Sequence, residues 1–445
     1  MNRILKNTLC LCLGFVSAAV AFVSCDTMGD ESYLGTVTVT LTAPESMDNF
    51  DFTAILVTAV NTSDKVSSTV KADEAGKAVI SGLTAGSYNI TASGKIDQIA
   101  INGVRNSVLV RSKENTDVEI ELLVAGSASG LVIKEVFYSG HSYLYDAGMV
   151  AMYKDCFVEL FNNSDEPISL DGLYIANLWS YAKRETGDNP EYSMVTDPSL
   201  DKDYVYADIV VRIPGSGSDY VLEPGKSFLV AQNAIDFNKE LREAIEDPDC
   251  WFAESVTEEG LAHVIDLSKA DMETYAVTWM QGKGRDGNEM FDLDNPNVPN
   301  VENVYYEDSK DFFQIDVNGA SVVIARLEKA LSDEDLYTYR YTVGGTSNEK
   351  ILMKIPVASV LDGVDNTGNL ESGKWKCLPN SIDLGFGYIP DDIGGATNFS
   401  MRRVIDKERT SAAGRLVLSD TNNTTNDFEA IDPPAPKGGY AGYEL

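Results

Sequence analysis

The sequence predicts an all-β protein built from two β-sandwich domains, the second with long insertions and a minor helix. Segments such as GTVTVTLTA (35–43) alternate β-branched residues between two faces, which is typical of half-buried strands. Turns that contain glycine or proline separate short segments of this kind. One segment, 236–247, has helical spacing instead, with Phe237, Leu241 and Ile245 on one stripe.

The chain begins with the features of a secretory signal. Arg3 and Lys6 give a positive start, and an apolar run follows from Leu9 to Val23. That run is short and rich in small residues, which does not favour a transmembrane span. We therefore interpret residues 1–24 as a signal peptide.

The signal ends in Phe22-Val23-Ser24-Cys25, which resembles a bacterial lipobox with Phe22 in the place of the usual Leu. The resemblance implies cleavage before Cys25 and acylation of that residue, so that a lipid anchor holds the protein in a membrane. Residues 25–34 would form a short acidic tether. This tether resembles that of surface-exported lipoproteins of Bacteroidetes-type bacteria. The resemblance implies a protein anchored in the outer membrane, either at the periplasmic face or at the cell surface, and favours the cell surface. An ordinary cleaved signal with a chance Cys is the alternative.

Composition excludes several classes of function. The formal net charge of −34 repels nucleic acid, so a nucleic-acid partner is not expected. Hydrophobic residues make up 44% of the chain, enough at this length to fill more than one core.

Cysteine and histidine are scarce after the anchor. Cys156, Cys250 and Cys377 have no metal-ligand spacing, and His141 and His263 lie far apart, so no structural zinc site is expected. We interpret Cys156 as a core residue. A disulfide between Cys250 and Cys377 is left open.

Residues 35–124 form the first predicted domain. The glycine-punctuated segment 73–94, DEAGKAVISGLTAGSYNITASG, resembles small transthyretin-like or carboxypeptidase-regulatory-like sandwiches of exported bacterial proteins. The resemblance implies a spacer in which Tyr88 is a core or corner residue. The small residues 125–130 form a flexible joint to the second domain.

Residues 131–430 form the second predicted domain, followed by a tail at 431–445. Its ordered blocks resemble the lamin-tail domain, as found in an uncharacterised family of Bacteroidetes-type lipoproteins. The resemblance implies an immunoglobulin-like sandwich. The blocks are LVIKEVFYSG (131–140), FVELFNNSDEPISLDGLYIAN (157–177), YVLEPGKSFLVAQNA (220–234), VNGASVVIAR (317–326), VASVLDGVDN (357–366), NFSMRRV (398–404) and DTNNTTNDFE (420–429).

The second block predicts a strand whose two faces differ. Val158 and Leu160 point to one side, while Glu159 lies with two phenylalanines on the other. Glu159 and Asp171 are either partners across a strand or solvated.

Two acidic, tyrosine-rich insertions, about 178–206 and 236–311, interrupt these blocks, and we expect 282–304 to be a loop. In the first, Trp179 and Tyr181 precede the basic pair Lys183 and Arg184, a combination that can stack on a ring and pair with an anion. These four residues are the candidate site for a ligand or partner. The alternative is that the aromatic rings close the end of the core.

The second insertion contains the only candidate metal ligands. Asp286, Asn288, Asp292 and Asp294 offer oxygen ligands for calcium within one loop, although their spacing is not that of an EF-hand. No other cofactor is indicated.

No catalytic motif stands out. GxSxG is absent, and Pro224-Gly225-Lys226-Ser227 lacks the earlier glycine of a phosphate-binding loop. We therefore expect no enzyme but a cell-envelope binding or accessory lipoprotein. Its relatives resemble accessories of TonB-dependent nutrient uptake, which implies an outer-membrane receptor or a small nutrient as partner. The alternatives are a surface adhesion protein that contacts glycan or matrix, and a hydrolase whose site no motif reveals.

Overall fold

The regular structure of the protein is mostly β-strand, in several sheets with few helices, which confirms the predicted fold class. The computed structural model describes residues 33–44, 47, 49–64, 66–96, 99–124, 130–138, 140–142, 151–152, 154–180, 192–250, 253, 256–316, 321–343, 345–367, 375–389 and 398–443. Among these residues no helix has the length and apolar character needed to span a bilayer. Cys25 lies outside the described residues.

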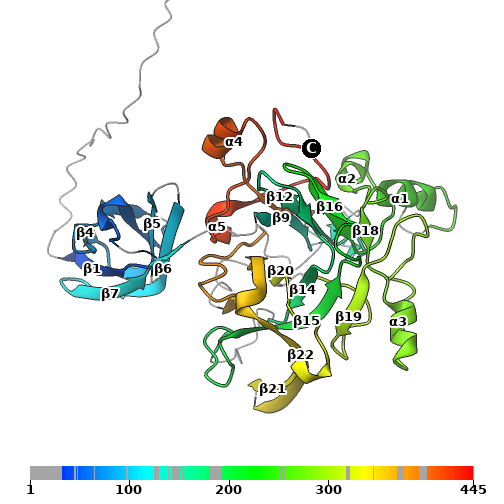
Figure 1. Ribbon diagram of the computed structural model, residues 1–445, viewed down its shortest axis with the longest axis horizontal. Helices are drawn as coiled ribbons and strands as arrows, with labels where there is room; N and C mark the ends of the chain where they lie inside the picture. The colour runs from blue at the N-terminus through cyan, green and yellow to red at the C-terminus, as the bar shows by residue number, and fades with distance from the viewer. Residues whose placement is uncertain are drawn as a thin grey trace, which may run out of the picture.

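Residues 35–124 form a first body with a core of its own, drawn in blue in Figure 1. Two sheets face each other, with the strand orders β4-β1-β7 and β3-β2-β5-β6-β8. The buried side chains of the first strand are those that alternation predicts, Val37, Val39 and Leu41. Tyr88 is buried, and its hydroxyl contacts Thr84, as expected of a corner residue. The strands are β1 (Gly35–Thr42), β2 (Ile55–Asn61), β3 (Ser67–Lys71), β4 (Lys77–Leu83), β5 (Gly86–Ile96), β6 (Ile99–Val110), β7 (Asn115–Glu121) and β8 (Leu123–Val124).

The second body is built on two larger sheets. The six-stranded sheet has the order β18-β17-β12-β9-β24-β25, and the seven-stranded sheet has the order β21-β22-β15-β14-β20-β23, with β19 also paired to β15. The first contains β9 (Leu131–Phe137), β12 (Phe157–Asn162), β17 (Ser227–Ala231), β18 (Met272–Glu273), β24 (Ser400–Arg403) and β25 (Phe428–Ile431). The second contains β14 (Tyr174–Leu178), β15 (Tyr204–Arg212), β19 (Glu302–Tyr306), β20 (Ser321–Ala325), β21 (Leu336–Val343), β22 (Thr346–Pro356) and β23 (Val360–Val364).

Short elements surround these sheets. Two small ladders pair β10 (His141–Ser142) with β11 (Ala151–Met152) and β13 (Ile168–Ser169) with β16 (Val221–Leu222). The helices are α1 (Phe237–Ile245), α2 (Glu258–His263), α3 (Val277–Gly282), α4 (Lys407–Ala413) and α5 (Thr424–Asp427). The predicted helix is confirmed as α1, and Asp236 caps its first turn by accepting a hydrogen bond from Lys239 N.

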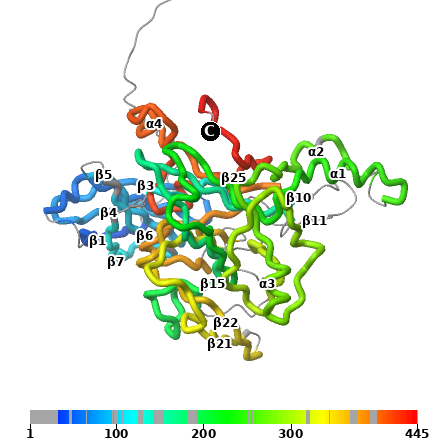
Figure 2. The backbone as a smooth tube through the Cα atoms, turned by 45° about the vertical axis from the view of Figure 1, so that its right-hand side comes forward, coloured from blue at the N-terminus to red at the C-terminus, as the bar shows by residue number. Residues whose placement is uncertain are grey.

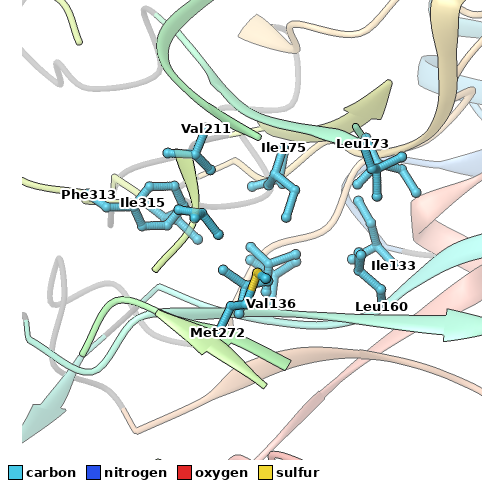
Figure 3. Close-up of a cluster of buried hydrophobic side chains, with 14 of the residues drawn as sticks. Ile133, Val136, Leu160, Leu173, Ile175, Val211, Met272, Phe313 and Ile315 are labelled. Atoms are coloured by element: carbon cyan, nitrogen blue, oxygen red, sulfur yellow. The ribbon is translucent and has the colours of Figure 1, made fainter. Parts of the chain in front are cut away.

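The main core lies between the two larger sheets. Figure 3 shows Ile133 and Leu160 of the six-stranded sheet facing Ile175 and Val211 of the seven-stranded sheet. The outer faces are buried as well, because α1 and α2 cover part of the first sheet and the segments 192–203 and 375–384 cover part of the second. The second body is therefore a sandwich with further layers on both sides.

The structure moves two of the predicted boundaries. Tyr204 and Tyr206 belong to β15 rather than to an insertion, and residues 302–304, the end of the predicted loop, belong to the strand β19. Both segments pair with neighbours in the seven-stranded sheet. Because this pairing depends on residues distant in the chain, the local sequence pattern gives only a weak signal of a strand.

The remaining cysteines are unpaired. Cys156 is fully buried, as predicted for a core residue, and burial raises the pKa of its thiol. Cys250 and Cys377 are free thiols, so the disulfide left open by the sequence does not form in this structure.

The two bodies touch through β6. Asn102 donates a hydrogen bond from its side chain to the carbonyl oxygen of Thr421. Figure 2 places the first body beside the orange end of the second, near α4.

Candidate functional site

Trp179 lies in a cluster of five aromatic rings, which we call the aromatic cluster. Its other members are Tyr206 of β15 and Tyr337, Tyr339 and Tyr341 of β21. The three tyrosines of β21 share one face because side chains on a strand repeat every second residue. The β21–β22 hairpin that carries them projects at the bottom of Figure 1.

Close ring contacts join the aromatic cluster in two groups, Trp179 with Tyr339 and Tyr341, and Tyr206 with Tyr337. The centroid of Trp179 lies 5.4 Å from that of Tyr339 and 5.1 Å from that of Tyr341. Tyr339 and Tyr341 stack at 5.6 Å with an interplanar angle of 17°, and Tyr206 lies 5.4 Å from Tyr337. These separations are those of favourable aromatic pairs.

Hydrogen bonds fix two of the phenol groups. Tyr339 donates to Asp197 Oδ2 at 2.6 Å, and Tyr206 donates to the carbonyl oxygen of Asp201 at 3.1 Å. Burial would raise the pKa of Asp197, but hydrogen bonds from Ser199 and Tyr339 outweigh it and lower that pKa. Burial raises the pKa of Tyr206 to about 12.

The rings differ in exposure. Tyr206 and Tyr339 are buried against the outer core of the seven-stranded sheet, whereas Trp179, Tyr337 and Tyr341 are only half-buried. The aromatic cluster therefore closes the core, as one interpretation of the sequence has it, and also presents ring surface to solvent.

Of the four predicted ligand-binding residues, only Trp179 can be placed. Tyr181, Lys183 and Arg184 lie outside the described residues. Sequence reasoning missed the tyrosines of β21, although the alternation in LYTYRYTV (336–343) is a signal that could have found them.

The predicted calcium ligands make separate contacts. Asp292 is buried and accepts hydrogen bonds from the amides of Ala276 and Val277 at the start of α3. Of the other three candidates, Asp286 is exposed. Asn288 donates a hydrogen bond to Asp311, and Asp294 accepts one from Asn300. Among the described residues no three His, Cys, Asp or Glu side chains are grouped as a metal site.

A second group of polar residues lies on the outer face of the six-stranded sheet, with three of its members buried and Arg402 half-buried. We call Lys134, Glu135, Glu159 and Arg402 the charged cluster. In the ladder, Glu135 of β9 lies opposite Glu159 of β12 and opposite Arg402 of β24. The pairing of β9 with β12 shifts by one residue here, since Glu159 pairs with Glu135 but Leu160 pairs with Ile133.

This shift is a β-bulge, and it decides which side chains share a face. Lys134 is the extra residue, so Lys134 and Glu135 both leave the inner core. The neighbouring residues confirm the bulge. Ile133 and Val136 are three positions apart, and both belong to the main core, whereas regular alternation would place them on opposite faces. Lys134 Nζ lies 2.8 Å from Glu159 Oε2, and both side chains are 0% exposed.

A segment near the end of the chain covers the charged cluster. We call residues 432–440 the strap, and Figure 1 shows this red segment beside β9 and β12. Ala435 N donates to Glu135 Oε1 at 2.8 Å, and Lys437 N donates to Glu159 Oε2 at 3.2 Å. The strap lies within the predicted tail, and it is not a free tail because its amides satisfy buried carboxylates.

Two cationic side chains of the six-stranded sheet donate hydrogen bonds to backbone carbonyl oxygens of the strap. Lys134 Nζ donates to the carbonyl oxygen of Gly438 at 2.9 Å, and Arg402 donates to that of Gly439 at 2.6 Å. The guanidinium of Arg402 also stacks on Tyr440, 3.6 Å from the ring centroid.

Burial shifts the ionisation of the charged cluster. It raises the pKa of Glu135 to about 7, with the neighbouring Glu159 acting in the same direction. Burial also lowers the pKa of Lys134 and outweighs the opposite effect of Glu159. Neutral forms of both residues are therefore more accessible than in water.

The residues that carry the terminal sequence blocks meet in another buried ionic group. Arg403 Nη2 donates to Asp362 Oδ2 at 2.6 Å, and its Nη1 lies 3.5 Å from Asp420 and 3.7 Å from Asp427. Asp362 also accepts a hydrogen bond from Ile133 N at 2.6 Å. This group joins β23, β24, β9 and the 419–427 segment, so its role is structural.

Glu159 and Asp171 are neither partners nor solvated, in contrast to both interpretations of the sequence. Glu159 pairs with Lys134. Asp171 accepts hydrogen bonds from the amides of Gly217, Asp219 and Tyr220, at 2.6, 2.9 and 2.8 Å. It therefore organises the loop before β16.

The fold and these sites define an all-β protein of stacked sheets, with surface aromatic rings and buried ionic groups. Residues 223–435 match the model of a family described as "Protein of unknown function (DUF4876)". The crystal structure of a DUF4876 family protein from Bacteroides thetaiotaomicron is similar over 90% of this chain and 96% of that chain, with 23% identity and a TM-score of 0.51. These similarities support the expected resemblance to an uncharacterised Bacteroidetes-type family.

Two further solved structures are less similar. A DUF3823 family protein from Bacteroides ovatus matches 44% of this chain and 98% of its own, with 13% identity and a TM-score of 0.16. The Bacillus anthracis TIE protein matches 45% of this chain and 26% of its own, with 10% identity and a TM-score of 0.18. No curated protein matches the chain.

Proposed function

We propose that this protein is a non-catalytic lipoprotein of the cell envelope that binds a ligand or partner through the aromatic cluster. Acylated Cys25 would hold it at the outer membrane, on the cell surface. The signal-like residues before Cys25 and the similarity to a Bacteroides protein support this proposal.

The proposal assigns different roles to the two bodies. The first, transthyretin-like or carboxypeptidase-regulatory-like, is a spacer that raises the second above the membrane. The second, lamin-tail-like and immunoglobulin-like, carries the binding surface and passes its ligand to a TonB-dependent receptor. The ordered sequence blocks of the second body support the lamin-tail-like assignment.

One observation carries the binding role. Trp179 and Tyr341 stay half-buried while their rings contact each other and the buried Tyr339. Buried neighbours hold these rings in place, so they lose little conformational entropy when a ligand stacks on them. Rigid aromatic anchors of this kind dominate many binding surfaces.

The test is capture of a partner by the tethered protein from envelopes. The variant with Trp179→Ala and Tyr341→Ala should lose at least tenfold in capture while keeping its melting temperature within a few degrees. Tyr388→Ala is the matched control, since Tyr388 is 37% exposed and lies outside the aromatic cluster. Unchanged capture by the double variant would contradict the proposal.

A surface adhesion protein that contacts glycan is the second candidate. The stacked pair Tyr339 and Tyr341 beside Trp179 favours it, because flat aromatic faces suit the apolar faces of sugar rings. Binding to a glycan array that Trp179→Ala abolishes would favour this function over transfer to a receptor.

A further inference from the structure

The contact between Lys134 and Glu159 has the geometry of two groups ready to react. Lys134 Nζ lies 2.8 Å from Glu159 Oε2, and neither side chain is exposed. Such a contact brings the amine to near-attack distance of the carboxyl group, about 3–3.5 Å between reacting atoms. The two residues lie on adjacent strands, so the sheet itself fixes their approach.

The surroundings exclude water from this contact. Phe137 and Phe157 lie on one side, with ring centroids 5.8 Å apart, and Val132 and Phe161 lie on the other. The strap closes the remaining side. A dry site destabilises the separated charges of an ammonium and a carboxylate, and it also disfavours hydrolysis of an amide once formed.

Two carboxylate oxygens at this place lack hydrogen-bond partners. Glu135 Oε2 and Glu159 Oε1 are buried, and neither makes a hydrogen bond. Glu135 lies directly opposite Glu159 in the ladder, a position in which Cβ atoms are about 4.5–5.5 Å apart. An ion pair alone leaves both oxygens unsatisfied, which is costly in a buried site.

We propose that Lys134 and Glu159 form an intramolecular amide bond that joins β9 to β12, with Glu135 as the group that moves the protons. The bond is an isopeptide bond between Nζ of the lysine and Cδ of the glutamate. It is a covalent modification of the protein by its own residues and needs no oxidant or cofactor.

The atoms balance without a further reactant. A proton passes from the Lys134 ammonium to the Glu159 carboxylate, and the neutral amine then attacks Cδ. The C–N bond forms, a C–O bond breaks, and one water leaves with the oxygen of Glu159 and two hydrogens of Nζ. Glu135 accepts one proton from nitrogen and delivers it to the departing oxygen, so it ends as it began.

The ionisation of the site agrees with these roles. The pKa of Glu135, raised by burial to about 7, lets it give and take a proton near neutral pH. The lowered pKa of Lys134 makes its neutral, nucleophilic form accessible.

The bond can be read in a tryptic digest of the full chain. Trypsin cleaves at free lysines, so the proposal predicts one cross-linked species in which residues 114–154, uncut at Lys134, are joined to residues 155–183. Its mass should be lower than the sum of the two peptides by one water. The chain contains its own control: Lys350 lies 2.9 Å from Glu307 but is partly exposed, and cleavage after Lys350 should be complete.

Variants distinguish a covalent bond between Lys134 and Glu159 from an ion pair that only stabilises the fold. Lys134→Arg should abolish the cross-link. Glu135→Gln should keep Lys134 and Glu159 in place and slow the appearance of the cross-link at least tenfold after refolding. Linear peptides 114–134, 135–154 and 155–183 from the folded wild type, with no loss of water, would overturn the proposal. A cross-link that forms equally fast in Glu135→Gln would overturn the role of Glu135.

Discussion

Removing the positive charge of Arg403 should strongly destabilise the second body. The side chain is 1% exposed and donates to Asp362, to the carbonyl oxygens of Ile133 and Ser419, and stacks over Phe428. Arg403→Met fills much of the same volume but leaves Asp362 and two further carboxylates without their cation. Breaking a buried ion pair on one side costs about 3–5 kcal/mol, and we expect that loss in the free energy of unfolding.

The loss should depend on pH in a defined direction. Burial raises the pKa of Asp362 to about 7 even with Arg403 in place, and Arg403 itself acts to lower it. Without the arginine these carboxylates are harder to ionise. As the pH falls they become protonated, and the variant then loses less of its free energy of unfolding. The difference between wild type and variant should therefore be larger at pH 8 than at pH 5.

Urea denaturation followed by circular dichroism measures both quantities. Arg409→Met is the matched control, because Arg409 is an exposed arginine of α4, and its effect should stay within about 0.5 kcal/mol. A loss below about 1 kcal/mol for Arg403→Met, or an equal loss at both pH values, would refute this account of the ionic group.

Three further predictions concern other sites. Asp171→Ala should cost about 1–2 kcal/mol and speed proteolysis near residues 214–219, since three amides lose their acceptor; unchanged proteolysis would contradict it. Burial raises the pKa of Asp292 to about 7, so its contribution to stability is full below about pH 4 and is lost as the pH rises through 7. Asp292→Asn should flatten this part of the melting profile. Cys25→Ala should abolish labelling by a fatty-acid analogue; a variant that still labels would exclude the proposed anchor.

The sequence predicts strands well where alternation is regular, and it fails where register changes. In β1 every buried side chain follows from period two. In β9 the bulge moves Lys134 and Glu135 to the same face, which alternation alone cannot reveal because it depends on the pairing with β12. The charged cluster was therefore invisible in the sequence, and Glu159 was interpreted either as a partner of Asp171 or as solvated.

Sequence reasoning also missed most of the aromatic cluster. Trp179 stood out as a large ring next to a basic pair, but its contacts come from Tyr339 and Tyr341, far along the chain. The calcium hypothesis was drawn from local spacing, which does not reveal that Asp292 accepts hydrogen bonds from two amides at the start of α3. In both cases the contacts are between residues distant in sequence.

The strap has a consequence for folding of the chain. Lys134 and Gly438 touch although 304 residues separate them, so β9 and β12 stay uncovered until the end of the chain has folded onto them. During that interval the charges of Lys134, Glu135 and Glu159 are hydrated. A partly folded sheet with hydrated charged side chains on its uncovered face resists pairing with other chains. Charged gatekeeper residues beside hydrophobic strands act in the same way. The same residues that are costly in the finished core thus protect the unfinished one from aggregation.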